Sequence, residues 1–280
     1  MIGWIGGKFY IKNWIISHFP PHKYFIEPFG GTVWTIWSKE PVKINVYNDK
    51  NAMLTNLFYH FFFNKKEFLE KAERLPISDR LIEFFSKKIN KPNKLEELTV
   101  EDAVMFAYCV TNSFSGCYQN RNYINYSSKR ITSTGEKFRA FLQRLENTHY
   151  KGNLILHNRD YKWIIEKYDS ENSLMYIDPP YLNLNYYEKK FSLEDHEELA
   201  RILNNAKSKV CISYYPNDIL YKWYPKGKWF YDYKEVHTFS QNKERTLKTE
   251  MLIMNYDFKK IQNEEKQLSL SDYVLKNLTK

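Results

Sequence analysis

Four short apolar segments of the sequence are each followed by an acidic residue. Residues 23–26, 44–47, 154–157 and 174–177 have the length and apolar content of buried strands, and 209–213 and 251–256 are similar. Helical spacing follows several of them, which is typical of a doubly wound α/β sheet. Ligands of such sheets bind beyond the carboxyl ends of the strands, so we expect the acids to share one pocket. These acids are Glu27, Asp49, Asp160 and Asp178.

The sequence Asp178-Pro179-Pro180-Tyr181 directly follows one of these predicted strands. Two consecutive prolines cannot continue a helix or a sheet ladder, so the chain leaves the strand here with free carbonyl groups. An acid, free carbonyls and an aromatic ring suit a planar ligand that carries an amino group, because the acid and carbonyls accept hydrogen bonds while Tyr181 stacks. A nucleobase is such a ligand. The alternative is a strand-ending turn with a packing tyrosine.

Glycines near the first strand predict a site for a nucleotide-like ligand. Pro28-Phe29-Gly30-Gly31 follows Glu27 and precedes a helical pattern at 33–37, which is the strand, turn and helix arrangement that holds nucleotides. Asp49 follows the next strand, where an acid can bind ribose hydroxyls; its alternative role is a helix N-cap. Near the N-terminus, Gly6-Gly7-Lys8 lets backbone approach an anionic group, with the lysine as countercharge.

The charge distribution favours a polyanionic partner. The net charge is +9, from 42 Lys and Arg against 33 Asp and Glu. Residues 112–151 carry seven basic and two acidic side chains, and residues 222–248 carry seven and three, so these two windows hold the whole excess. Concentrated basic charge indicates contact with nucleic acid, although two solvated faces would give the same counts.

Cysteine, histidine and hydropathy patterns exclude several classes of function. Cys109, Cys117 and Cys211 lack disulfide or zinc spacing, which fits a reducing cytoplasm, and none follows a proline, as a cytosine-C5 methyltransferase nucleophile would. His18 and His22 are separated by two prolines, so we expect no metal site. No signal peptide or membrane-spanning apolar run is evident, so we expect a cytoplasmic protein.

Residues 52–150 lack the alternation of strands and helices. Their apolar spacing predicts several helices inserted between the second and third strands, with a break at Pro76. Within them lies a polar, aromatic and basic segment whose Asn, Gln and Arg side chains can read base edges; an ordinary polar loop is the alternative. The candidate DNA-binding residues there are Asn112, Ser113, Gln119, Asn120, Arg121, Asn122 and Tyr123.

A β-hairpin is expected in the second basic window. Its last strand is 251–256 and residues 240–245 form its polar tip. Lys243 and Arg245 at this tip are expected to bind DNA phosphates beside the pocket. Residues 259–280 form a charged tail to which the sequence assigns no chemistry.

Taken together and in this order, the motifs resemble those of the Dam-like alpha group of DNA adenine-N6 methyltransferases. The resemblance covers about residues 3–257 and is most specific at Asp178–Tyr181 and in the ordered set. The set is Trp4-x-Gly6-Gly7-Lys8, Glu27-Pro-Phe-Gly-Gly31, Tyr47-Asn-Asp49, Asp160-Tyr161, Asp178-Pro-Pro-Tyr181, Phe191-x-x-x-Asp195-His196 and Thr249-Glu250-x-x-x-x-Asn255-Tyr256.

The resemblance implies a Rossmann-like methyltransferase sheet with a mainly helical target-recognition insertion. The sheet would comprise 1–51 and 152–258, the insertion 52–151, and the tail 259–280. It implies S-adenosylmethionine as methyl donor and double-stranded DNA as partner; whether a cognate restriction endonuclease accompanies it stays open. The implied donor-binding residues are Trp4, Gly6, Gly7, Lys8, Glu27, Pro28, Phe29, Gly30 and Gly31 at the methionine half, Asp49 at the ribose, Asp160 and Tyr161 at the adenine, and Asp178.

We therefore predict a site-specific DNA adenine-N6 methyltransferase that flips its target base out of the duplex onto Asp178–Tyr181. Cytosine-N4 methylation is the nearest enzymatic alternative and more often has Ser at the position of Asp178. Methylation of RNA or of protein glutamine is disfavoured, the latter because it typically uses Asn-Pro-Pro-Tyr. A catalytically impaired DNA-binding relative is a further alternative, because many relatives have a small residue where this chain has bulky residues at 32–34, and Trp34 is placed to crowd the donor.

Overall fold

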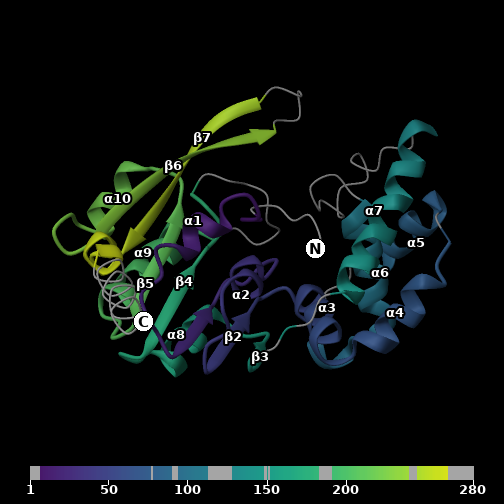
Figure 1. Cartoon of the computed structure of the whole chain (residues 1–280), viewed down its shortest axis with the longest axis horizontal. Coiled ribbons are helices and arrows are strands. Elements are labelled where there is room, and N and C mark those ends of the chain that lie inside the picture. Colours follow the sequence, from purple (N-terminus) through teal and green to yellow (C-terminus); the bar gives the residue numbers. More distant parts are fainter. Residues whose placement is uncertain are drawn as a thin grey trace, which may run out of the picture.

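Seven strands form one sheet in the order β3-β2-β1-β4-β5-β7-β6 (Figure 1). The structure is a computed structural model that describes residues 7–76, 78–89, 94–112, 128–147, 150, 152–182, 191–239 and 245–263. The strands are β1 (Tyr24–Glu27), β2 (Ile44–Asn48), β3 (Leu154–His157), β4 (Ser173–Ile177), β5 (Lys209–Tyr214), β6 (Phe230–Phe239) and β7 (Arg245–Met254). The predicted α/β fold class is confirmed.

Strands β1 to β5 are parallel, and β1 lies between β2 and β4. The chain therefore winds outward in both directions from β1, and the carboxyl ends of β1 and β4 form the topological switch point where ligands of such sheets bind. β7 runs antiparallel to β5, and β6 pairs with β7 as the expected hairpin. That hairpin is longer than predicted, because β7 begins at Arg245 instead of residue 251.

The sheet is buried on both faces because its strands are apolar at successive positions, as parallel sheets require. Phe25 and Leu174 belong to one hydrophobic core and their neighbours Ile26 and Met175 to the other, since side chains alternate along a strand. The first face is covered by α1 (Lys12–Ile16), α2 (Trp34–Ser38) and α3 (Ala52–Phe63), and the second by α8 (Tyr161–Tyr168), α9 (Leu193–Asn204) and α10 (Asp218–Trp223).

Helices occupy the stretch between β2 and β3, as the apolar spacing predicted, and form a lobe beside the sheet (Figure 1). After α3 they are α4 (Lys65–Glu73), α5 (Asp79–Ile89), the 3-10 helix η1 (Leu95–Glu97), α6 (Val100–Asn112) and α7 (Ser128–Glu146). Phe58 of α3 lies 5.4 Å from the ring of Tyr47 in β2, and Phe61 lies 5.4 Å from Phe141 in α7. One hydrophobic core thus runs from the sheet into the lobe through α3.

The N-terminal helix is tied to the far edge of the sheet by polar contacts between residues distant in sequence. His18 Nε2 lies 2.8 Å from Asp232 Oδ2 in β6, and Trp14 Nε1 donates to the same oxygen over 3.2 Å. The hydroxyl of Tyr256 donates to the carbonyl of His18 over 3.0 Å. These contacts hold α1 and the residues that follow it beside β6. Within the described ranges, no helix has both the length and the apolarity needed to cross a membrane.

Candidate active site

The acids predicted to follow the strands do lie at the carboxyl edge of the sheet, with one difference at β1. Glu27 is the last residue of β1 and pairs with Tyr47, so it belongs to the strand instead of following it. Asp49 and Asp178 directly follow β2 and β4, and Asp160 comes after β3 as the N-cap of α8. Parallel pairing of β1 with β2 and β4 brings Glu27, Asp49 and Asp178 to one edge.

The strongest ionic contact at this edge joins the N-terminus to β4. Lys8 Nζ lies 2.9 Å from Asp178 Oδ1 and 4.0 Å from Glu250 Oε1 of β7. Burial alone would lower the pKa of Lys8, but the two carboxylates outweigh burial and raise that pKa above its ordinary value. Lys8 is therefore charged, and its positive charge is held between Asp178 and Glu250.

The side chain of Asp178 is only 18% exposed. Burial raises the pKa of Asp178 to about 6, against the opposing effect of Lys8, while Glu250 adds to the rise. Asp178 is consequently ionised near neutral pH only because Lys8 offsets much of the cost of burial. An ionised carboxylate accepts hydrogen bonds and donates none, so this side chain can receive an amino group.

The side chain of Tyr181 is buried, and both its hydroxyl and its ring are held by contacts. Its hydroxyl donates to Glu250 Oε2 over 2.8 Å and lies 3.0 Å from Ser213 Oγ of β5. The ammonium of Lys8 lies 4.5 Å from the centre of its ring, and the ring of Tyr215 meets it edge-on at 4.7 Å. The ring that follows the two prolines is thus fixed beside Asp178.

Glu27 has a buried carboxyl oxygen, Oε2, with no hydrogen-bond partner in the part of the chain that the structure describes. Burial raises the pKa of Glu27 well above its ordinary value, the charge of Asp178 raises it further, and Lys39 opposes the rise. An unpartnered buried carboxyl group is costly, which marks this oxygen as a place for a hydrogen-bond donor or a cation.

The turn after β1 is packed closely against β2. A Cβ atom at Gly30 would lie 2.2 Å from the ring of Tyr47, so only glycine fits. Gly31 has a φ of 48°, and the hydroxyl of Tyr47 donates to its carbonyl over 3.0 Å. Val33 has a φ of 59°, a left-handed conformation that is unfavourable for a β-branched residue. The turn is therefore held in a strained shape by its contacts with β2.

Asp49 braces this turn with both of its carboxylate oxygens. Oδ2 accepts from the backbone N–H of Gly31 over 3.0 Å, and Oδ1 accepts from that of Asn51 over 2.8 Å. Burial raises the pKa of Asp49, and these two hydrogen bonds oppose the rise. Helix α3 is capped by Asn51, whose side chain accepts from Leu54, so the N-cap alternative for Asp49 is wrong.

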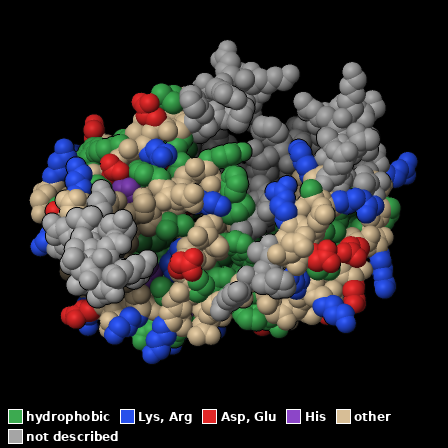
Figure 2. Space-filling view, viewed as in Figure 1, with side chains coloured by type: hydrophobic (Ala, Val, Ile, Leu, Met, Phe, Trp, Pro, Cys, Tyr) green, Lys and Arg blue, Asp and Glu red, His purple; other side chains and the backbone are tan. Residues whose placement is uncertain are grey.

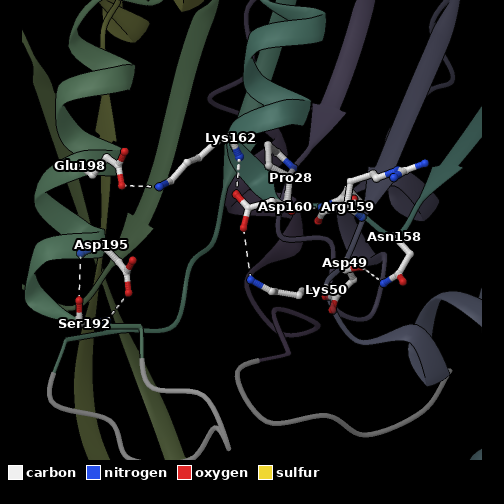
Figure 3. Close-up of polar contacts among 11 residues, drawn as sticks. Pro28, Asp49, Lys50, Asn158, Arg159, Asp160, Lys162, Ser192, Asp195 and Glu198 are labelled. Carbon is white, nitrogen blue, oxygen red and sulfur yellow. Dashed lines mark hydrogen bonds and ion pairs between the residues drawn. The ribbon is translucent and has the colours of Figure 1, made fainter. Parts of the chain in front are cut away.

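Asp160 lies near Asp49 in Figure 3, across the ends of β2 and β3. Its Oδ1 caps α8 by accepting from the N–H of Lys162 over 3.1 Å, and its Oδ2 lies 3.2 Å from Lys50 Nζ. This ion pair is exposed and contributes little to stability. Tyr161 is buried, and its ring stacks on Phe29 at 5.0 Å. A capping box formed by Ser192 and Asp195 opens α9 and is visible in the same view.

Comparison with known proteins assigns this arrangement to a family. Residues 4–267 match the D12 class N6 adenine-specific DNA methyltransferases. The chain belongs to that family. It is similar to the DNA adenine methylase of Escherichia coli K12, with 23% identity over 239 residues, 80% of this chain and 84% of the relative. The DNA adenine methylase of Salmonella typhimurium LT2 is 24% identical over 247 residues, which are 80% of this chain and 84% of the relative. That of Serratia marcescens is 23% identical over 264 residues, which are 85% of this chain and 91% of the relative.

The predicted adenine-specific DNA methyltransferase is therefore confirmed, and the cytosine-N4 alternative is set aside. The matched residues include the whole carboxyl edge of the sheet, where Asp178-Pro179-Pro180-Tyr181 follows β4. Among the described residues of this methyltransferase, no group of three or more His, Cys, Asp and Glu side chains is arranged to hold a metal ion.

Several residues predicted for the methyltransferase site lie outside the described part of the chain. Gly7 is described and exposed, whereas Trp4 and Gly6 are not described. Asn112 ends α6 with both polar side-chain atoms buried and, among described residues, without partners. Arg245 begins β7, but its side chain lies outside the description. The other predicted DNA-binding residues outside it are Ser113, Gln119, Asn120, Arg121, Asn122, Tyr123 and Lys243.

Three side chains of the methyltransferase pocket were not assigned a role from the sequence: Ser213, Tyr215 and Glu250. Glu250 precedes the apolar run 251–254, and an acid at the border of a buried strand is a signal that could have marked it. Ser213 and Tyr215 carried no such signal, because their position depends on how β5 and β7 pair beside Tyr181.

Replacing Gly30 by Ala tests the packing of the turn in this methyltransferase. The added methyl group would collide with Tyr47, which is fully buried and cannot move aside, so we expect a loss of roughly 1–3 kcal/mol of stability. Gly31→Ala is the matched control, because nothing lies within 4 Å of its Cβ position and only its positive φ opposes the change. A lower melting temperature for Gly31→Ala than for Gly30→Ala in thermal unfolding would contradict this packing.

Proposed function

We propose that the enzyme transfers a methyl group from S-adenosylmethionine to the N6 amino group of an adenine flipped out of duplex DNA, with Asp178 as the acceptor that positions that amino group. The observation that carries the proposal is the contact of Lys8 with Asp178 at 2.9 Å, directly before Pro179-Pro180-Tyr181. This contact favours an ionised carboxylate at the point where the strand ends and its carbonyls become free. We also propose that the enzyme is cytoplasmic, because its substrate is DNA.

The proposed role of Asp178 is to make the adenine amino group a better nucleophile. The lone pair of the adenine amino group is conjugated with the ring and is a poor nucleophile. Hydrogen bonds from the amino group to Asp178 and to the carbonyl region of Pro179 favour a tetrahedral nitrogen, whose lone pair is then available for direct displacement. Tyr181, fixed by Glu250, supports the base. The N6–C bond forms as the S–C bond of the donor breaks, and N6 then releases one proton to solvent, so no covalent enzyme intermediate is needed.

The pocket residues fit the methyl donor. The donor supplies a methyl group on a cationic sulfonium centre, and it also carries an ammonium group and a carboxylate. The unpartnered Oε2 of Glu27 would receive the ammonium group, while Lys8 offers a charge for the carboxylate. The turn at Gly30 and Gly31 leaves room for close approach.

The adenosine half of the donor would be held at the ends of β2 and β3. Asp49 would bind the ribose hydroxyls, and Asp160 would accept from the adenine amino group beside Tyr161. In the structure Asp160 faces Lys50, an exposed pair that can open at little cost. Trp34 packs its ring on Phe9 at 4.7 Å, which gives this bulky residue a partner other than the donor.

DNA recognition is divided in this proposal between the inserted helices and the hairpin. Residues 52–151 form the target-recognition insertion on the catalytic unit of 1–51 and 152–258. Supporting observations are the Lys and Arg side chains that gather on the lobe of α4–α7 in Figure 2, and the hairpin that rises from the same side of the sheet as α1 in Figure 1. The segment 112–123 would read bases, and Lys243 and Arg245 would bind phosphates.

Asp178→Ala should lower methyl transfer by at least about 10²-fold, because it removes an acceptor that is needed most in the transition state. Donor binding, measured by calorimetry, should persist. Asp218→Ala is the control, since Asp218 is an exposed acid at the start of α10. Near-normal turnover of the Asp178 variant on unmethylated DNA would refute its proposed role.

Substitutions in the two DNA-binding regions should have different effects. Asn120→Ala or Arg121→Ala should relax discrimination at particular base pairs by about 1–3 kcal/mol, whereas removing the charges of Lys243 and Arg245 should weaken binding to all sequences and reduce its salt dependence. Methylation rates on a panel of single-base variants of the target, at fixed salt, separate the two. The division would be wrong if the hairpin substitutions changed the ranking of the target variants by methylation rate and the loop substitutions left that ranking unchanged.

A further inference from the structure

An aromatic and cationic surface adjoins the pocket and has no part in the roles assigned above. It consists of Phe9, Tyr10, Lys12 and Trp34, which we call the aromatic lip. The ring of Phe9 lies 5.1 Å from that of Tyr10 and 4.7 Å from that of Trp34. Lys12 Nζ lies 4.6 Å from the centre of the Phe9 ring and 5.2 Å from that of Trp34.

Two aromatic side chains of the lip are exposed to solvent. Tyr10 is 88% exposed and Phe9 is 44% exposed. A turn in which Ile11 N–H donates to the carbonyl of Lys8 over 3.1 Å presents these two rings, while the buried Ile11 and Ile15 anchor the chain beneath them. The exposed rings are thus carried on an anchored turn at a defined place.

That place is next to the Lys8–Asp178 contact at the carboxyl edge of the sheet. Phe9 directly follows Lys8, whose ammonium contacts Asp178, and Trp34 begins α2 just after the glycine turn. Figure 2 shows hydrophobic side chains reaching the surface between the sheet and the helical lobe. A duplex that delivers a base to Asp178 must therefore pass close to the lip.

Duplex DNA with one base flipped out offers the chemistry that this surface matches. Flipping leaves neighbouring bases without a stacking partner, and an aromatic ring can take that place. A lysine beside the rings neutralises phosphate and releases counterions. Aromatic rings combined with a cation are the pattern by which proteins hold unstacked bases.

We propose that the aromatic lip contacts the target DNA beside the flipped adenine, with Tyr10 stacking on a base left exposed by flipping and Lys12 facing a phosphate. This inference rests on the proposed function of Asp178 in the same pocket. It adds a surface that stabilises the flipped state of the DNA and does not hold the methyl donor.

The test uses the full-length protein and a duplex with the sequence that the wild type methylates, with 2-aminopurine in place of the target adenine. Tyr10→Ala should weaken binding roughly 5- to 150-fold, the size of one base–aromatic stack, and should lower the fluorescence gain that reports flipping. Tyr10→Phe should restore both. Lys12→Ala should lower the salt slope of binding by about 1.

Trp163→Ala is the matched control, because Trp163 is 41% exposed on α8, outside both proposed DNA-binding regions, and also lies under a lysine, Lys167, at 5.1 Å. It should leave binding and fluorescence unchanged. Unchanged DNA binding and flipping in Tyr10→Ala would overturn the proposal, and so would equal losses in Trp163→Ala. A loss of S-adenosylmethionine affinity in Tyr10→Ala that matched its loss of DNA affinity would also overturn it. Failure of the proposed function differs from all of these, because the wild type itself would then not methylate DNA.

Discussion

The contact between Lys8 and Asp178 is the interaction on which the active site depends. The carboxyl groups of Glu27, Asp49 and Asp178 lie at the same edge of the sheet, and burial raises the pKa of each of them. Lys8 is the cation that contacts Asp178 directly, and it also faces Glu250, which in turn holds the hydroxyl of Tyr181. One ammonium group therefore sets both the charge of the acceptor and the position of the ring beside it.

The scaffold around this contact explains why it can be maintained. Lys8 comes from a segment that is fixed at α1 by the contacts of Trp14 and His18 with Asp232, so its position depends on the hairpin at the other edge of the sheet. The core that continues through α3 couples the helical lobe to the strand ends. Asp49 and the ring of Tyr47 brace the strained glycine turn. The pocket is thus assembled from segments that are far apart in the sequence.

Features of the structure that depend on local sequence pattern were predicted. Contacts that depend on how distant strands pair in the sheet were not. Apolar runs, the capping box at Ser192 and the edge position of Asp178 follow from neighbouring residues, and the structure has them. The partners of Tyr181 do not, because Glu250 and Ser213 approach it only when β7 pairs with β5. The Lys8–Asp178 contact and the left-handed backbone of Val33 were likewise invisible, since tertiary packing imposes both.

The most direct test of the central contact is the pH dependence of kcat/KM for methyl transfer in the wild type, Lys8→Met and Lys8→Arg. Protonation removes the acceptor, so activity should fall as the pH drops through about 6, the raised pKa of Asp178. Because Lys8 lowers that pKa, Lys8→Met should move the acidic limb to higher pH, and Lys8→Arg should return it toward the wild type. Glu27 and Glu250 also face Asp178 and remain in every variant. An acidic limb at the same pH in all three proteins would contradict the role of Lys8 in keeping Asp178 ionised.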